Sequence, residues 1–240
     1  MKLIFKEQPI DYSTYSFPYC VYCIKEDIDS LSQIYSKGFL PYSNDLNETN
    51  SIFYLARSVK VNLAMHTTDR REKKVHNNIY RFIDSTKTST EFIDIQTIRE
   101  NIDFYTETYL DFAKKNFKGG MAENRIRYIL NREYLNGVFR ITYESEILAD
   151  ILIICENYDF IHSWFSFYNT NYPKESEIGK WVIYKLIEWS KENEYKQLFL
   201  GTCYGKNSIY KLQFSKESQY FDGQGWANTI SELKKKIEME

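Results

Sequence analysis

The stretch of sequence that decides the fold runs from residue 159 to residue 214 and reads DFIHSWFSFYNTNYPKESEIGKWVIYKLIEWSKENEYKQLFLGTCYGKNSIYKLQF. Its first part, Phe160 to Tyr168, is an aromatic segment typical of a strand. A loop then leads through Gly179 into an amphipathic helix, and a short strand, Gln197 to Gly201, comes next. A further element, Lys206 to Phe214, completes the stretch. The order strand, loop, helix, strand predicts a crossover connection within one sheet.

The elements that precede this stretch extend the same sheet. Asp94 is placed to cap a helix, and a second helix covers residues 122–134. Two apolar strands, 137–143 and 147–155, come before the aromatic strand and are separated by tight turns. A last helix covers residues 228–239. Two helices, three antiparallel strands, a helix, a strand and a helix predict an α/β (α+β) fold, with a mixed sheet that carries helices on both faces.

The N-terminal third predicts a smaller α/β module. Residues 52–63 alternate like a strand, and Asp69 opens a strongly charged helix. The segment from Ser85 to Thr90, STKTST, has the composition of a linker. We therefore expect two domains, residues 1–84 and residues 91–240.

The composition is that of an ordinary soluble globular protein, with 43% hydrophobic and 27% charged residues among 240. A net charge of −2 gives no global field that would attract nucleic acid, so any such contact needs a local basic patch. No apolar run is long enough to span a bilayer, and the N-terminus lacks the pattern of a secretory signal. Four cysteines in a chain of this length do not form a disulfide scaffold, so we expect a reducing, cytoplasmic location without a membrane. The 17% of aromatic residues reflect either base composition or surfaces that stack unpaired bases.

The order of elements resembles the acyl-transfer part of the GCN5-like N-acyltransferases. In that fold a small-residue loop before the helix holds the pyrophosphate of CoA with backbone N–H groups. Here the loop reads SEIGKW, in which Gly179 keeps the first small residue and Trp181 replaces the second. We expect Trp181 to crowd a pyrophosphate and Glu175 and Glu177 to repel it, so that CoA does not bind. The alternative is that Gly179 only permits a tight turn into the helix.

The sequence motifs of the same stretch are similar to those of the arginyl- and leucyl-tRNA–protein transferases. The resemblance implies that the chain is a divergent member of this family. The matching pieces are Ser166–Asn169 for T-F-Y-D, with Asn169 for the usual Asp; residues 176–183 for S-L-G-x-Y-A-I; Leu198–Gly201 for Y-L-Y-L-G; and Ile209–Lys211 with Phe214 for x-Y-K-x-x-F. Weaker likenesses precede them: Tyr19–Cys23 for C-x-Y-C, Tyr35–Phe39 for Y-x-x-L-I-D-R-G-W, and residues 59–75 for the strand and basic run around S-K-S-H-K-K-V.

This resemblance implies transfer of an amino acid from aminoacyl-tRNA to a protein N-terminus or a related amine, with no cofactor besides the charged tRNA. Backbone donors would stabilise the oxyanion that forms when the amine attacks the ester. The catalytic residues it implies are Tyr168, Asn169, Tyr210 and Lys211, and the residues beside the bound donor are Gly179, Lys180 and Trp181. Two alternatives stay open: a GCN5-like enzyme with another acyl donor, and a catalytically silent binding module on the same fold.

A basic run at the start of the charged helix is the candidate site for tRNA phosphates: Arg70, Arg71, Lys73 and Lys74. Cations in the first turn oppose the helix dipole, which indicates a role other than helix stability. Lys180 and Lys211 could meet the 3′ end of the tRNA. The alternative is that the run is only a solvated helix face.

No metal site is predicted. Cys20 and Cys23 are weak candidates, because the second cysteine pair of the family should fall near Phe53 and Tyr54, and neither is a cysteine. A four-thiolate site is therefore impossible within the chain, although His66 or His76 could complete a mixed site. We interpret the two thiols as buried. His162 lies within an aromatic strand and is interpreted as a packed histidine.

Overall fold

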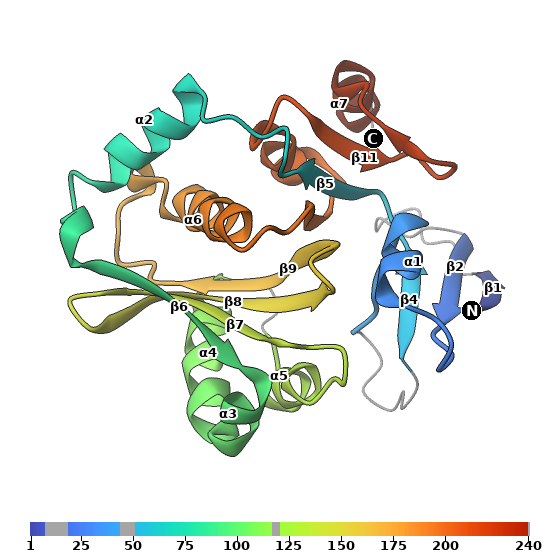
Figure 1. Ribbon diagram of the computed structural model, residues 1–240, viewed down its shortest axis with the longest axis horizontal. Helices are drawn as coiled ribbons and strands as arrows, with labels where there is room; N and C mark the ends of the chain where they lie inside the picture. Colours follow the sequence, from blue (N-terminus) through green and yellow to red (C-terminus); the bar gives the residue numbers. More distant parts are fainter. Residues whose placement is uncertain (8–18, 44–50, 117–120, 240) are drawn as a thin grey trace.

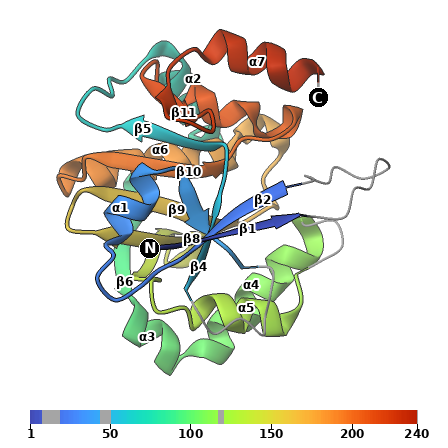
Figure 2. The same ribbon diagram turned by 90° about the vertical axis from the view of Figure 1, so that its right-hand side faces the viewer.

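The computed structural model describes residues 1–7, 19–43, 51–116 and 121–239. Its strands form two sheets (Figure 1). The smaller sheet is antiparallel and belongs to the N-terminal part of the chain. Its strands, in spatial order, are β1 (Lys2–Glu7), β2 (Tyr19–Ile24), β4 (Ile52–Leu55) and β3 (Phe39–Pro41). In Figure 2, β1 and β2 lie side by side at the front of the molecule.

The larger sheet has eight strands and is mixed. In spatial order they are β12 (Trp226–Ala227), β11 (Ser218–Phe221), β5 (Ser58–Asn62), β10 (Gln197–Thr202), β9 (Phe160–Tyr168), β8 (Glu146–Glu156), β7 (Gly137–Tyr143) and β6 (Thr88–Asp94). All neighbours pair antiparallel except β9 and β10, which are parallel because a helix connects them.

Helices cover both faces of this sheet (Figure 1). On one face lies α6 (Ile178–Glu192), with α2 (Arg70–Ile79) packed against it. On the other lie α3 (Ile95–Glu100), α4 (Ile102–Asn116) and α5 (Glu123–Leu130). The remaining helical segments are α1 (Leu31–Ser36), α7 (Ile230–Met239) and the short 3-10 segments η1 (Ser85–Lys87), η2 (Lys174–Ser176) and η3 (Lys206–Gln213). The predicted α/β class, a mixed sheet flanked by helices, is confirmed.

Two hydrophobic cores stabilise the molecule, one on each face of the large sheet. The core under α6 is built around Trp181 and the apolar residues of β5, β9 and β10. The other core joins the N-terminal sheet to the large one: Tyr35 of α1 stacks on Phe160 at 4.2 Å between ring centroids and contacts Phe199 edge-on. Glu156, at the end of β8, also accepts hydrogen bonds from backbone N–H groups in the first turn of α1. Two interactions therefore fix α1 on the large sheet: the burial of aromatic surface, and the capping of its first turn by the Glu156 carboxylate.

The expected linker at residues 85–90 is wrong. The segment forms η1 and then enters β6, which pairs with β7 over its whole length. β6 is an edge strand whose side chains are mostly exposed, so its Thr and Ser content resembles a loop while its β-branched residues favour extended backbone.

The expected strand at 52–63 divides into β4 and β5, which belong to different sheets. β5 inserts between β10 and β11, so a strand of residues 1–84 lies inside the sheet of residues 91–240. The division into those two domains stays a prediction. β11 and β12 were not predicted from the sequence, and the element expected at residues 206–214 is the 3-10 helix η3, which ends at Gln213.

The parallel pair β9 and β10 separates early. Register partners exist only at Leu198 with Ile161 and at Phe199 with His162. Beyond them β9 continues beside β8 alone, and β10, which pairs with β5 from Gln197 onward, passes through an irregularity between Phe199 and Thr202. The two strands therefore part just after His162. No helix in the described ranges is both long enough and apolar enough to cross a membrane.

Candidate functional site

A cleft of about 1570 Å³ opens where β9 and β10 part. Most of its lining comes from the second half of β9, the loop and first turn of α6, the end of β10 with η3, and the N-terminal sheet, and Phe112 of α4 and Arg125 of α5 complete it. Its volume exceeds the roughly 300–1,000 Å³ that suits one small ligand. The cleft therefore has room for two reacting groups at once.

Lys211 and His162 lie at the floor of the cleft. The Lys211 ammonium donates a hydrogen bond to the carbonyl of Thr202 at 2.9 Å. A Cβ built on Gly201 would lie 3.4 Å from Lys211 Nζ and 3.9 Å from His162 Nε2, so both nitrogens converge on this glycine. Gly201 has φ +79°, and a side chain there would be strained as well as directed at the two nitrogens.

Burial sets the ionisation of both groups. Desolvation lowers the pKa of Lys211 to about 8. Desolvation, with a smaller contribution from the nearby Lys211 charge, lowers the pKa of His162 to about 3. His162 is therefore a neutral imidazole at physiological pH. The pKa of Lys211 lies within about one pH unit of physiological pH, so both its charged and its neutral form are populated there. Amines and imidazoles with such pKa values can stabilise charge or move protons in catalysis.

His162 is held by one partner and leaves one nitrogen toward the cleft. Its Nδ1 lies 2.8 Å from the hydroxyl of Tyr35, whose pKa burial raises well above the ordinary value. Tyr35 therefore keeps its proton, and its hydroxyl shares one hydrogen bond with Nδ1, whose direction depends on the imidazole tautomer. The imidazole Nε2 is buried and has no hydrogen-bond partner among the described residues.

Two tyrosines form one wall of the cleft. Burial raises the pKa of both Tyr168 and Tyr210, so each remains a hydroxyl donor. The Tyr168 phenol lies against the first turn of α6, where a Cβ on Gly179 would approach its oxygen to 2.9 Å. Gly179 is thus required by the approach of Tyr168 and is not only a turn residue. The edge of Phe112, with ring centroids 5.2 Å apart, fixes the other side of Tyr168.

An acidic side chain occupies the N-terminus of α6. Glu177 has φ 52° and its carboxylate accepts hydrogen bonds from Lys180 and, at 2.8 Å, from Asn78 of α2. Burial alone would raise the pKa of Glu177, but these hydrogen bonds bring it below the ordinary value, so the group is charged. A helix N-terminus favours a phosphate, yet a fixed carboxylate at this one opposes it.

Five predicted site residues come together in the cleft and two do not. Those that line it are Tyr168, Gly179, Lys180, Tyr210 and Lys211. Trp181 is fully buried beneath α2 and meets Tyr80 edge-on, so the expected obstruction of a pyrophosphate by Trp181 is wrong. Helical periodicity turns residue 181 toward the core. Asn169 is a turn residue whose side chain accepts from the backbone of Asn171 at 2.9 Å, and it does not line the cleft.

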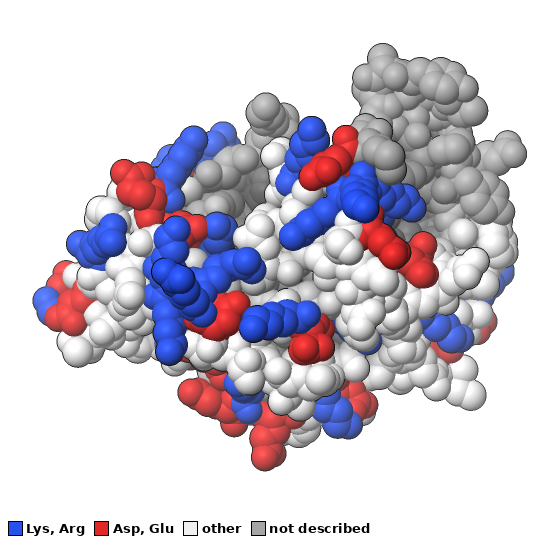
Figure 3. Space-filling view, turned by 90° about the horizontal axis from the view of Figure 1, so that it is seen from above, with Lys and Arg blue, Asp and Glu red and all other residues white. Residues whose placement is uncertain are grey.

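The basic run lies on α2, at the rim of the cleft. The side chain of Asp69 caps the helix, and all four cations are exposed: Arg70, Arg71, Lys73 and Lys74. The Arg71 guanidinium donates to the carbonyl of Gln213 at 2.9 Å. The Lys74 charge is close enough to lower the pKa of Glu177, and Asn78 bonds to the same carboxylate. Figure 3 shows Lys and Arg side chains spread over this face, with acidic side chains between them.

The cysteines of β2 do not form a thiolate pair. Cys23 is fully buried, and burial raises its pKa to about 11. Cys20 is half-buried and lines the cleft. The sheet register sets Phe53 beside Cys23 and Tyr54 beside Tyr22. The positions at which the sequence resemblance would place a second cysteine pair thus neighbour β2, and aromatic residues fill them.

The interpretation of His162 as a packed histidine is confirmed, since the residue is 2% exposed, but its contact with Tyr35 beside the cleft was not predicted. The two residues are 127 positions apart, and no local pattern connects them. One sequence feature pointed to this region, namely the resemblance of Tyr35–Phe39 to a segment of the tRNA–protein transferases. It draws attention to Tyr35 but does not indicate that Tyr35 contacts His162.

Neither protein-family models nor curated proteins give a match to this chain. Solved structures do, at low identity. L-PGS from Bacillus licheniformis is 16% identical over 77% of this chain and 56% of that chain, with a TM-score of 0.47. The C-terminal domain (DUF2156) of a protein described as a lysylphosphatidylglycerol synthetase, from Agrobacterium fabrum, is 14% identical over 78% and 55%, with a TM-score of 0.45.

FemX is 7% identical over 72% of this chain and 59% of that chain, with a TM-score of 0.44. This chain therefore spans little more than half the length of the proteins it resembles. Similarities at these identities and TM-scores assign no reaction to this chain.

Proposed function

We propose that this protein transfers an aminoacyl group from a charged tRNA to an amine, and that the amine is the N-terminus of a protein. The observation that carries the proposal is the Lys211 amine, with its pKa of about 8, at the floor of a cleft that opens where two parallel strands part. Fixed donors at such a position stabilise the oxyanion of an acyl transfer.

The donor site is argued from charge. An aminoacyl ester is already activated and needs no CoA. The Glu177 carboxylate at the start of α6 disfavours the pyrophosphate of CoA. The exposed cations of α2 border the same rim and suit the phosphates of a tRNA acceptor end. Aromatic side chains in the cleft, among them Tyr22, Tyr42 and Trp164, offer faces on which the terminal base can stack.

In the proposed reaction the acceptor amine attacks the ester carbonyl, and the new C–N bond forms as the bond to the ribose oxygen breaks. Lys211 in its ammonium form and the hydroxyl of Tyr168 or Tyr210 stabilise the oxyanion. His162, as a neutral imidazole behind Lys211, adds no second positive charge beside the ammonium. The proton that the attacking amine loses ends on the ribose oxygen, so the step balances without a further reactant.

The test is a transfer assay with tRNA charged with labelled amino acids and peptides with an acidic N-terminus. Transfer should be seen with one or more amino acids. It should be lost when the peptide is N-acetylated, and it should fall about 10²–10³-fold in Lys211→Met. Absence of transfer from every charged tRNA would contradict the proposal and favour a silent binding module.

Calorimetric titration with acetyl-CoA tests the remaining alternative, a GCN5-like enzyme that uses another acyl donor. We expect no binding tighter than about 10 μM, which corresponds to roughly −7 kcal/mol. Tight binding, together with acetyl transfer to the same peptides, would instead support a GCN5-like enzyme that uses acyl-CoA.

A further inference from the structure

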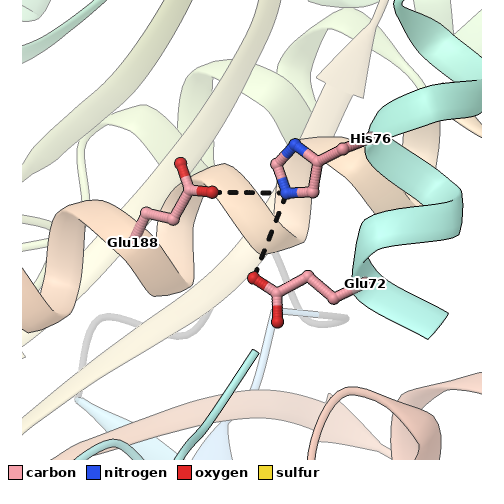
Figure 4. Close-up of side chains that lie close together, drawn as sticks. All are labelled: Glu72, His76 and Glu188. Atoms are coloured by element: carbon pink, nitrogen blue, oxygen red, sulfur yellow. Dashed lines mark ion pairs between the residues drawn. The ribbon is translucent and has the colours of Figure 1, made fainter. Parts of the chain in front are cut away.

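A second group of titratable side chains lies away from the cleft, between α2 and α6. It consists of Glu72 and His76, one turn apart on α2, and Glu188 on α6. The dashed lines in Figure 4 converge on the Nε2 of His76, which is 3.2 Å from Glu188 Oε1 and 4.0 Å from Glu72 Oε1. One donor atom from each residue lies within 4.8 Å of the other two.

Glu72 makes this group unusual. Its residue is 3% exposed, and its Oε2 is buried without a hydrogen-bond partner among the described residues. The nearest nitrogen to Oε2 is His66 Nε2 at 3.5 Å, but that atom lies closer to the carbonyl of Phe214, at 3.1 Å. Desolvation of a carboxylate is costly unless a cation compensates it. The nearby Lys185 pairs with Glu188, on the far side of the group.

We propose that Glu72, His76 and Glu188 bind a divalent metal ion, and that the ion is Zn²⁺. Ligand atoms bound tetrahedrally at about 2.0–2.2 Å lie roughly 3.4 Å from one another. His76 Nε2 is 3.2 Å from Glu188 Oε1 and 4.0 Å from Glu72 Oε1, so the Glu72 carboxylate has to move closer when the ion binds. An imidazole with two carboxylates suits zinc and disfavours Mg²⁺ or Ca²⁺, which select oxygen ligands. The three residues line a small cavity of about 290 Å³ together with Thr68, Lys73 and Asn77, which leaves room for a water as the fourth ligand.

The ion would clamp α2 to α6. α2 carries the exposed basic run on its outer side, and Glu72 and His76 face α6. Bound zinc would neutralise the two carboxylates and fix the orientation of α2. The inference does not depend on the proposed transfer reaction, since it rests on the geometry of these three residues alone.

The experiment uses full-length, tag-free protein with Cys20→Ser and Cys23→Ser, so that the thiols of β2 do not compete for zinc. Calorimetric titration with ZnCl₂ should give one site. Glu188→Gln and His76→Gln should each weaken it at least 100-fold, and Glu192→Gln, an exposed carboxylate one turn further along α6, should leave it unchanged. Zinc at 100 times its dissociation constant should raise the thermal midpoint by roughly 5–10 °C.

X-ray absorption of the zinc-loaded protein gives an independent reading. A first shell of nitrogen and oxygen without sulfur is expected. Equal zinc affinity in Glu188→Gln and in the parent protein, or sulfur in the shell, would overturn the proposal. Circular dichroism of each variant confirms that it is folded, and Glu188→Gln is the more conservative change because Glu188 is only partly buried.

Discussion

Lys211 is a residue that the fold holds at a cost. Lowering its pKa to about 8 corresponds to about 3 kcal/mol against the charged form. Its ammonium donates a hydrogen bond to the carbonyl of Thr202. A residue kept in an unfavourable state is expected where function requires that state.

We therefore expect Lys211→Met to leave the thermal midpoint unchanged or to raise it while amino-acid transfer falls about 10²–10³-fold. Methionine fills a similar volume without a charge to desolvate, and this offsets the lost bond to Thr202. Thermal denaturation followed by circular dichroism, beside the transfer assay, measures both quantities. A fall of the midpoint by many degrees would mean that Lys211 is structural.

The pH dependence of stability should report on His162. Its pKa is about 3 in the folded protein and about 6.5 in the unfolded chain, so the unfolded chain binds the extra proton between these values. The free energy of unfolding should then fall as the pH decreases below about 6.5, by roughly 2 kcal/mol at pH 5 from this group.

The comparison that isolates this contribution is urea unfolding of the parent protein and of His162→Gln at pH 7 and pH 5. Burial also lowers the pKa of His66, which acts in the same direction, so the difference between the two proteins is the relevant quantity. If the variant loses as much stability on acidification as the parent, His162 is not the buried neutral group described here.

At this scale the sequence predicted the residues that belong to one continuous motif. Tyr168, Gly179, Tyr210 and Lys211 follow each other within 44 residues, and the order of elements brings them together. The side chain of Trp181 was assigned to the wrong side of α6. Its direction depends on the residue at which the helix begins, here after the αL residue Glu177, and the local sequence pattern does not determine that residue. His162 required knowledge of the distant Tyr35.

Among the elements, α2 is the one whose charge requires an explanation beyond helix stability. Arg70, Lys73 and Lys74 are exposed, whereas Arg71 is engaged with the backbone of η3. If α2 contacts tRNA, replacement of Arg70, Lys73 and Lys74 by Ala removes up to three phosphate contacts. The slope of log affinity against log salt should then flatten by roughly 2–3 units.

A matched control is offered by α7, where Lys234, Lys235 and Lys236 carry the same charge away from the cleft. Their replacement by Ala should leave most of the slope. Binding measured by filter retention at several salt concentrations distinguishes the two triple variants. Equal slopes in the two triple variants would mean that the basic run of α2 is a solvated helix face and does not contact tRNA.

Elements with a buried apolar face were predictable, and elements at the edges of sheets were not. β8 is buried over most of its length and reads as a continuous apolar run. β6 is an exposed edge, so its TST segment looked like a linker. β11 and β12 are short and depend on pairing with β5, which no local signal announces.

For the whole molecule, the unresolved issue is whether residues 1–84 and 91–240 are separate units. The sequence suggested a division there because the segment between them is polar. The structure adds two connections across it: β5 lies between β10 and β11, and Tyr35 and Phe53 belong to the same core as Phe160. Such contacts come from tertiary packing, which pattern in one sequence cannot supply.

We expect residues 91–240 expressed alone to lack a cooperative unfolding transition. Without β5, the parted edge of β10 loses its backbone partner, and without Tyr35 and Phe53 the core around Phe160 opens to water. Differential scanning calorimetry and near-UV circular dichroism of the fragment, beside the full chain, measure the effect. The full chain should unfold in one transition because both of its cores include residues from each side of the division. A fragment that melts cooperatively near the midpoint of the full chain would instead establish two autonomous domains. The cleft, which both ranges line, would then have to be assembled by docking rather than by folding.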